Sequence, residues 1–142
     1  MKVRELMSRP VIRIHADEPV TVAARTLAHY NIGALPVCST DGRLCGVITD
    51  RDIVTRCLAA ERDLSRTKVA DVMTAGALSV EADADTALAA HMMGRKQVRR
   101  LPVLENGRLC GMISLGDLAS CEETGYDAVD ALSEITGNVS NR

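Results

Sequence analysis

Hydrophobic and polar positions follow two spacings along this chain, one typical of helices and one typical of short strands. Between residues 20 and 28, apolar side chains recur three and four positions apart, which predicts a helix with one buried face. The runs 34–38 and 44–48 are short, apolar and joined by an Asp-Gly turn, which predicts two antiparallel strands. A β-branched run at 11–14 predicts a preceding strand, and a further helix is predicted at 52–60.

The second half of the chain repeats this order of elements. Met7 corresponds to Met73 at a spacing of 66 residues, and Cys45 corresponds to Cys110 at a spacing of 65, because the second hairpin turn is one residue shorter. The chain is therefore an internal duplication. The repeat predicts strands at 78–80, 100–104 and 109–114, and helices at 85–95 and from 115 onward.

Neither repeat is large enough to bury much apolar surface alone, since each holds roughly 60 residues and a small sheet. We therefore expect an α/β (α+β) fold in which two β-α-β-β-α repeats pack about a pseudo-twofold axis. After the second repeat, Val129, Leu132 and Ile135 have helical spacing and predict one extra helix. The boundaries that we place are 1–64 for the first repeat, 65–125 for the second, and 126–142 for the C-terminal helix and tail.

Each hairpin leads into a motif that pairs a hydroxyl with a carboxylate three positions later. The motifs are Gly-Val-Ile-Thr-Asp-Arg-Asp at 46–52 and Gly-Met-Ile-Ser-Leu-Gly-Asp at 111–117. At a strand-to-helix turn both groups can face one ligand, and the helix N-terminus adds free N–H groups and a positive dipole end. Such a turn suits an anion that bears a diol, as a nucleotide does. The alternative is helix capping, a common role for Ser, Thr and Asp, and the two roles can coexist.

Composition and charge exclude several classes of function. The formal net charge of −2 argues against general nucleic-acid binding, and the absence of Phe and Trp leaves no platform for stacking bases. No apolar run approaches the roughly 20 residues that span a bilayer, and the start of the chain leads into no secretory segment. We therefore expect a cytoplasmic protein with no nucleic-acid or membrane partner.

The cysteines and histidines form no spacing typical of a disulfide framework, a metal site or a catalytic triad. Five cysteines are an odd number, contain no C-x-x-C pair and fit a reducing compartment, where we expect them to be small buried hydrophobes. A metal site made from scattered Cys and His remains an alternative without spacing to support it. The chain also lacks a phosphate-cradling Gly loop and paired His on a helix face, so we expect no enzyme activity and no catalytic residues.

The duplicated motifs resemble those of the cystathionine β-synthase (CBS) domain, and the whole chain is similar to a stand-alone tandem pair, a Bateman module. The resemblance covers residues 1 to about 121 and lies in Met-Ser and Met-Thr at the two starts, in two Leu-Pro-Val strands, and in the two hydroxyl-carboxylate motifs. The uninterrupted runs 32–37 and 49–54 are also similar to small two-repeat bacterial stress proteins.

This resemblance implies a regulatory module that binds adenine nucleotides (AMP, ADP or ATP) in clefts between the repeats. It assigns Asp52 and Asp117 to the ribose hydroxyls, and Thr49 and Ser114 to the phosphate. It further implies a homodimer formed through the helices that follow these motifs, and a separate, unknown effector protein. The complete set of nucleotide-binding residues that it implies is Val11, Ile12, Ala34, Pro36, Thr49, Arg51, Asp52, Ala77, Leu78, Arg99, Arg100, Pro102, Ser114 and Asp117.

Two further hypotheses remain open at this stage. The module could be a ligand-free structural or oligomerisation domain, or it could bind NAD, S-adenosylmethionine or a metal ion. Within the nucleotide hypothesis, the cationic groups are not duplicated, because Gly33 and Ala34 correspond to Arg99 and Arg100. Arg is always charged and suits phosphate, so we expect two unequal sites, of which the tighter depends on Arg100.

Overall fold

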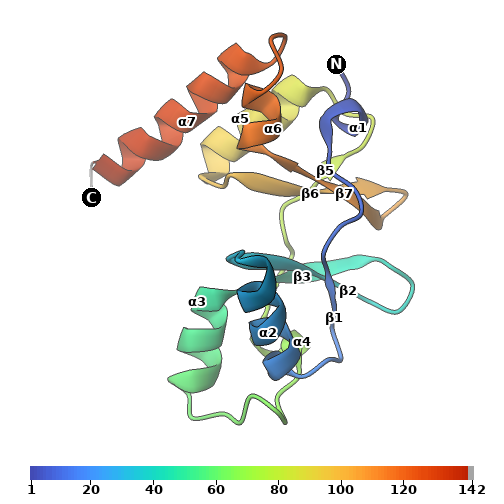
Figure 1. Cartoon of the computed structure of the whole chain (residues 1–142), viewed down its shortest axis with the longest axis vertical. Coiled ribbons are helices and arrows are strands. Elements are labelled where there is room, and N and C mark those ends of the chain that lie inside the picture. Colours follow the sequence, from blue (N-terminus) through green and yellow to red (C-terminus); the bar gives the residue numbers. More distant parts are fainter. Residues whose placement is uncertain (141–142) are drawn as a thin grey trace. The chain divides into compact units, whose positions relative to one another are not determined.

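The structure, a computed structural model, describes residues 1–140 and contains two compact units (Figure 1). One unit is Ile12–Ala77, which we call the first-repeat unit. The other combines Met1–Val11 with Leu78–Arg142, and we call it the second-repeat unit. The beginning of the chain therefore joins the second repeat rather than the first.

The first-repeat unit is a four-stranded sheet with helices packed on it. The strand order is β1-β2-β3-β4, in which β1 pairs parallel with β2 and the other pairs are antiparallel. Its strands are β1 (Ile14–His15), β2 (Ala34–Cys38), β3 (Leu44–Thr49) and β4 (Thr74–Ala75). Its helices are α2 (Val20–Tyr30), α3 (Asp50–Asp52), the π-helix η1 (Ile53–Leu58) and α4 (Val69–Val72).

The second-repeat unit has the same plan with a three-stranded sheet and one additional helix. Its strand order is β5-β6-β7, with β5 parallel to β6. The strands are β5 (Val80–Glu81), β6 (Arg100–Glu105) and β7 (Arg108–Ser114). The helices are α1 (Val3–Leu6), α5 (Thr86–Lys96), α6 (Leu115–Ala119) and α7 (Gly125–Ser140), and α7 lies across α5 and α6 (Figure 1).

The exchange of segments between the repeats follows from where two short helices bury their valines. Val3 of α1 is fully buried in the core of the second-repeat unit, and its N–H donates to the Ala84 carbonyl at 2.9 Å. Val69 of α4 is fully buried in the core of the first-repeat unit, and its N–H donates to the Glu18 carbonyl at 2.9 Å. Because each repeat supplies the other repeat's unit with its opening segment, the compact units differ from the repeats that the sequence delimits.

The proline of each Leu-Pro-Val strand lies in a central strand, although Pro usually lies in an edge strand or at a strand start. Pro36 lies in β2 and pairs with Val47 of β3 on one side. On the other side, β1 pairs only with Val37 and Cys38. The N–H that Pro36 lacks would therefore have no carbonyl acceptor in β1. The short length of β1 therefore makes a central proline tolerable.

The equivalent helices α5 and α2 begin in different ways. Asp85 caps α5, since its carboxylate accepts from the Ala87 N–H at 2.8 Å. The N-cap of α2 is Pro19, and neither Asp17 nor Glu18 caps it. The α2 start is stabilised instead by backbone contacts, because the Val20 N–H donates to the Thr67 carbonyl at 2.9 Å. The charged segment 61–68, which precedes α4, is thus part of the fold of the first-repeat unit.

Candidate functional site

The first hydroxyl-carboxylate turn is a reciprocal helix cap. Thr49, the last residue of β3, accepts through Oγ1 from the Asp52 N–H at 3.0 Å. Asp52 in turn accepts through Oδ2 from the Thr49 N–H at 3.1 Å. Together these bonds satisfy two N–H groups that the start of a helix leaves free, so the capping alternative is confirmed for this turn.

The second turn has the same cap with side chains of the other repeat. The Asp117 N–H donates to Ser114 Oγ at 3.0 Å, and the Ser114 N–H donates to Asp117 Oδ2 at 2.8 Å. Each cap uses one lone pair of the hydroxyl and one carboxylate oxygen. The hydroxyl proton and the second oxygen, Oδ1, are left for another partner, so capping and ligand binding are compatible.

The two carboxylates differ in what surrounds Oδ1. Asp52 is 7% exposed, and its Oδ1 lies 3.8 Å from Nε of Arg56 and 3.4 Å from Oγ1 of Thr74. Cys121 occupies the position of Arg56 in the second repeat, and Asp117 is only half-buried. Within residues 1–140, no ion pair or hydrogen bond to Asp117 Oδ1 is found. Oδ1 of Asp117 is therefore available to a ligand, whereas Oδ1 of Asp52 already has partners in the protein.

The hairpin register places a cation beside the second turn and none at the equivalent place in the first. Arg100 of β6 is the direct cross-strand partner of Ser114 in β7, so the two side chains leave the same face of the sheet. The equivalent pair in the first repeat is Ala34 and Thr49. Arg100 is exposed, as an arginine that meets a phosphate must be. The structure thus brings together Arg100, Ser114 and Asp117, three of the residues that the resemblance implied.

The other residues of the predicted set lie in the first turn of α3, in the central strands, and in the segments that join the two units. Arg51 is exposed in the first turn of α3, and the Arg99 carbonyl accepts from the Leu115 N–H at 2.8 Å. Two of them are prolines buried in the central strands, each two positions after the residue that pairs with Thr49 or Ser114. Four others lie where the chain passes from one unit to the other. These six are Pro36, Pro102, Val11, Ile12, Ala77 and Leu78.

Sequence reasoning missed Arg56 and Thr74, the two residues that distinguish the first carboxylate from the second. Arg56 follows Asp52 by four positions on a predicted helix, a spacing at which opposite charges interact. That signal was present in the sequence. Thr74 carried no comparable signal, because its place beside Asp52 depends on β4 joining the sheet of the first repeat.

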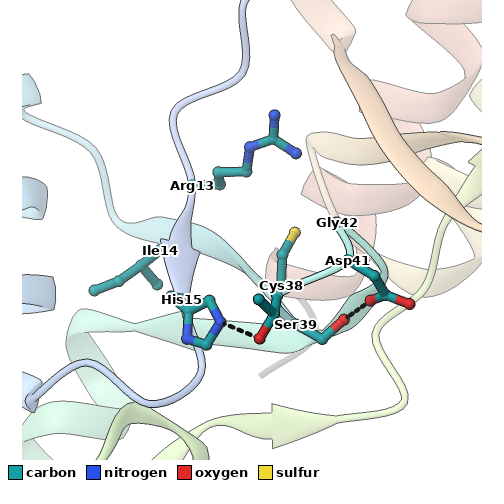
Figure 2. A pocket seen from close by; sticks show the side chains of 8 residues that line it. Arg13, Ile14, His15, Cys38, Ser39, Asp41 and Gly42 are labelled. Carbon is teal, nitrogen blue, oxygen red and sulfur yellow. Dashed lines mark hydrogen bonds between the residues drawn. The ribbon is translucent and has the colours of Figure 1, made fainter.

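A separate hollow of about 410 Å³ lies at the opposite end of the β2–β3 hairpin (Figure 2). His15 accepts through Nδ1 from the Asp17 N–H at 3.1 Å, so its Nε2 carries the proton and donates to Thr40 Oγ1 at 3.1 Å. Burial raises the pKa of the Cys38 thiol, and a hydrogen bond with Arg13 opposes the rise in part. These polar groups engage one another, and the hollow is remote from the capped turns in the hairpin.

The duplicated motif begins with glycine because another segment approaches its backbone closely. A Cβ atom on Gly46 would collide with the Thr74 carbonyl of β4. A Cβ atom on Gly111 would lie 2.6 Å from Sδ of Met7 and 3.2 Å from the Ser8 carbonyl. These glycines are therefore required by the fold of each unit.

Comparison with known proteins finds one family. The CBS domain matches residues 3–59 and 69–123, which together span most of the chain. Among relatives, YlbB of Bacillus subtilis is 39% identical over 136 residues, covering 95% of this chain and 91% of its own. Hypoxic response protein 1 of Mycobacterium tuberculosis is 36% identical over 116 residues, covering 82% of this chain and 81% of its own.

Solved structures share the fold. The structure of hypoxic response protein I with two coordinated zinc ions has a TM-score of 0.77 and 35% identity, covering 84% of this chain and 98% of its own. The CBS domain pair of protein MJ0100, in complex with 5′-methylthioadenosine and S-adenosyl-L-methionine, has a TM-score of 0.70 and 26% identity, covering 84% of this chain and 94% of its own. The predicted α+β fold of tandem repeats is thereby confirmed.

Neither a membrane-spanning helix nor a metal-binding cluster is present in residues 1–140. No helix within residues 1–140 has the length and apolar character required to cross a bilayer. No group of three or more His, Cys, Asp or Glu side chains in that part of the chain is arranged to hold a metal ion.

Proposed function

The chain belongs to the CBS-domain family, and from this premise we propose that it is a non-catalytic regulatory module that binds an adenine nucleotide and signals to a separate protein. The observation that carries the proposal is the pair of capped turns, each of which presents a hydroxyl and a carboxylate at a helix start. Nucleotides of the AMP, ADP and ATP class combine a diol with an anion, and each turn can meet both features.

The turn at Asp117 supports the tighter site in this proposal. Its Oδ1 atom can accept from a ribose hydroxyl without displacing another partner among the described residues. Arg100 lies on the same sheet face as Ser114, where its planar fork of donors can reach a phosphate. At Asp52, a ribose must instead compete with Arg56 and Thr74, so we propose a weaker site there.

The ligands named for one related structure are consistent with an adenosine site. The MJ0100 pair binds 5′-methylthioadenosine and S-adenosyl-L-methionine, which share an adenosine group and lack a phosphate. In the present chain, Arg100 favours a phosphate-bearing ligand over these two. Zinc, which hypoxic response protein I coordinates, is the alternative ligand that a relative suggests.

Isothermal titration calorimetry tests the proposal with AMP, 2′-deoxy-AMP and adenosine. We expect AMP to bind, the deoxy analogue to bind about tenfold or more weakly, and adenosine to lose the contribution of Arg100. In the Arg100→Ala variant, AMP should lose about tenfold while adenosine changes little. A thermal-shift measurement tests the alternative, because a ligand at 100 times its Kd should add about 2.7 kcal/mol of stability. If AMP, ADP, ATP, NAD and S-adenosylmethionine all leave the melting temperature unchanged, the protein is a ligand-free structural module.

The proposal includes self-association as a homodimer through the helices that follow the two motifs. In the helices that follow the motifs, Ile53, Cys57 and Leu118 are buried inside their own units. Val54 and Leu58 are each 54% exposed and remain free for a contact. The helices that follow the motifs therefore supply an apolar surface mainly in the first-repeat unit.

A further inference from the structure

The residue that follows the capping hydroxyl differs in charge between the two turns. In the first turn it is Asp50, which is exposed, and in the second it is Leu115, which is buried. One backbone hydrogen bond holds both residues in equivalent places. The Asp50 N–H donates to the Gly33 carbonyl at 3.1 Å, and the Leu115 N–H donates to the Arg99 carbonyl at 2.8 Å. The two turns therefore present different side chains at matched positions of the backbone.

The Asp50 carboxylate is directed toward the start of β2. Its Oδ2 atom lies 3.6 Å from the position that a Cβ atom of Gly33 would occupy. Its Oδ1 atom accepts from the Arg51 N–H at 2.7 Å. Gly33 immediately precedes Ala34, the cross-strand partner of Thr49. The carboxylate therefore lies beside the strand start that pairs with the capping hydroxyl.

The second-repeat unit has cations at the corresponding strand start. The counterparts of Gly33 and Ala34 are Arg99 and Arg100, and both are exposed. The counterpart of Asp50 is apolar, so this strand start has no equivalent carboxylate. The charge beside the capping hydroxyl is thus negative in one unit and positive in the other.

No ion pair to the Asp50 carboxylate is found among residues 1–140. Arg56, on the same helical segment, lies 3.8 Å from Asp52 Oδ1 and donates to the Met73 carbonyl at 3.1 Å, so its guanidinium is already engaged. Arg51 is exposed, but neighbouring residues of a helix do not face each other, so its side chain leaves on another side of the helix. A ligand group beside Gly33 therefore meets a carboxylate that no cation offsets.

We propose that Asp50 selects the ligand of the first turn by charge, so that this turn prefers an adenosine derivative without a phosphate. Thr49, which the proposed function assigns to the 5′ substituent of the ligand, directly precedes Asp50. A phosphate at that place is repelled, a free 5′ hydroxyl is not, and the sulfonium cation of S-adenosyl-L-methionine is attracted. This inference rests on the proposed function and assigns different classes of adenosine ligand to its two sites.

The test isolates the first turn in an Asp117→Ala background, in which the second turn is weakened. Asp50→Asn then removes the charge and keeps an oxygen that can accept from the Arg51 N–H. Asp50 is exposed, so the variant should fold, which its circular dichroism melting curve will verify. As a matched control, Glu61→Gln removes one negative charge from an exposed position of the same unit, outside the capped turn.

Calorimetry with adenosine, AMP and S-adenosyl-L-methionine measures three affinities at the first turn. In the Asp117→Ala background, AMP should bind most weakly of the three. Asp50→Asn should tighten AMP by about threefold to tenfold, weaken S-adenosyl-L-methionine by about the same factor, and leave adenosine within about twofold. The control should leave all three affinities within about twofold. Because the two charged ligands shift in opposite directions, a general loss of structure does not produce this result.

Two results would overturn the inference. One is tighter binding of AMP than of adenosine at the first turn, and the other is an unchanged ratio of the three affinities in Asp50→Asn. In either case adenosine and AMP still bind, so the proposed nucleotide site stands and only the selection by charge is removed. If none of the three ligands binds the parent protein, the proposed function itself fails, and the inference fails with it.

Discussion

The two units of this protein have the same backbone plan and differ in what surrounds their capped turns and helices. Both have a parallel strand, a helix, a hairpin and a reciprocally capped turn. In the first-repeat unit the capping carboxylate meets Arg56, and the helix layer is open. In the second-repeat unit the carboxylate meets no described cation, and α7 covers the helices. Duplication has preserved the scaffold, while the surroundings of the equivalent groups have diverged.

The largest difference in stability that we expect between the two units concerns the glycines that begin the motifs, Gly46 and Gly111. In Gly46→Ala, the new methyl group meets the backbone carbonyl of Thr74, which can move only if β4 moves, so we expect a loss of about 3 kcal/mol. In Gly111→Ala, the nearest atom is the flexible thioether of Met7, so we expect a loss of about 1 kcal/mol. Urea denaturation of the two variants measures both losses in the free energy of unfolding. Equal losses would show that Met7 is held as rigidly beside Gly111 as the Thr74 backbone is beside Gly46.

The next prediction concerns the helix that covers one unit only. Gly94→Val adds a side chain where α5 meets Ala131 and Glu134 of α7, and we expect a loss of about 2 kcal/mol through displacement of α7. The control Leu88→Val changes an exposed position of α5 and should stay within about 0.5 kcal/mol of the parent. Hydrogen exchange of the α7 amides should rise in the Gly94 variant alone; unchanged exchange would mean that α7 does not depend on this close approach.

A third prediction makes the two carboxylates more alike. Arg56→Ala removes the cation beside Asp52 Oδ1, so the first turn should bind adenine nucleotide more tightly, by about threefold to tenfold. Cys121→Arg places a cation in the corresponding position of the second turn and should weaken binding there. Calorimetry that resolves the two sites measures both changes, and a weaker first site in Arg56→Ala would mean that Arg56 contacts the ligand.

The smallest predicted effect concerns the N-terminal segment of the second-repeat unit. Arg4 donates to Asp83 at 2.8 Å and to Glu105 at 2.9 Å, and the Arg4 hydrogen bond lowers the pKa of Asp83 below its ordinary value of 3.8. The counterpart of Arg4 in the first-repeat unit is Ala70. The stability that comes from Asp83 is therefore present above about pH 4 and lost as the pH falls through the lowered pKa.

Urea midpoints at pH 6 and pH 3 test this effect. The parent should be slightly more stable than Asp83→Asn at pH 6, and the difference should shrink at pH 3, where the carboxyl group of the parent is increasingly protonated. The Asp83 side chain is 65% exposed and the Arg4 side chain 33% exposed, so salt should reduce the difference further. A difference that grows on acidification would contradict the lowered pKa.

The sequence predicted the repeated elements and both capped turns, because these depend on local spacing and on residues within four positions of one another. It could not show which core receives α1 and α4, because Val3 and Val69 belong to equivalent short helices and either unit could bury them. The segment exchange is a matter of long-range packing, and it also creates the contact between Thr74 and Asp52.

The tail helix illustrates a second limit of sequence reasoning. Val129, Leu132 and Ile135 predicted the helix correctly, yet only Ile135 is buried. The close approach of α7 to Gly94 admits only a small side chain at the contact, so Ala131 lies there, while Val129 and Leu132 face outward. Apolar spacing alone favours the larger side chains, because it carries no information about the distance between helices.

The central claim is that the second turn binds nucleotide more tightly than the first, and calorimetric titration of AMP into Asp117→Ala and Asp52→Ala tests it most directly. Loss of a charge-assisted hydrogen bond weakens binding by about tenfold to a hundredfold. Asp117→Ala should therefore remove the tighter binding step and retain the weaker one, while Asp52→Ala should leave the tighter step unchanged. Retention of the tighter step in Asp117→Ala, together with its loss in Asp52→Ala, would contradict the account.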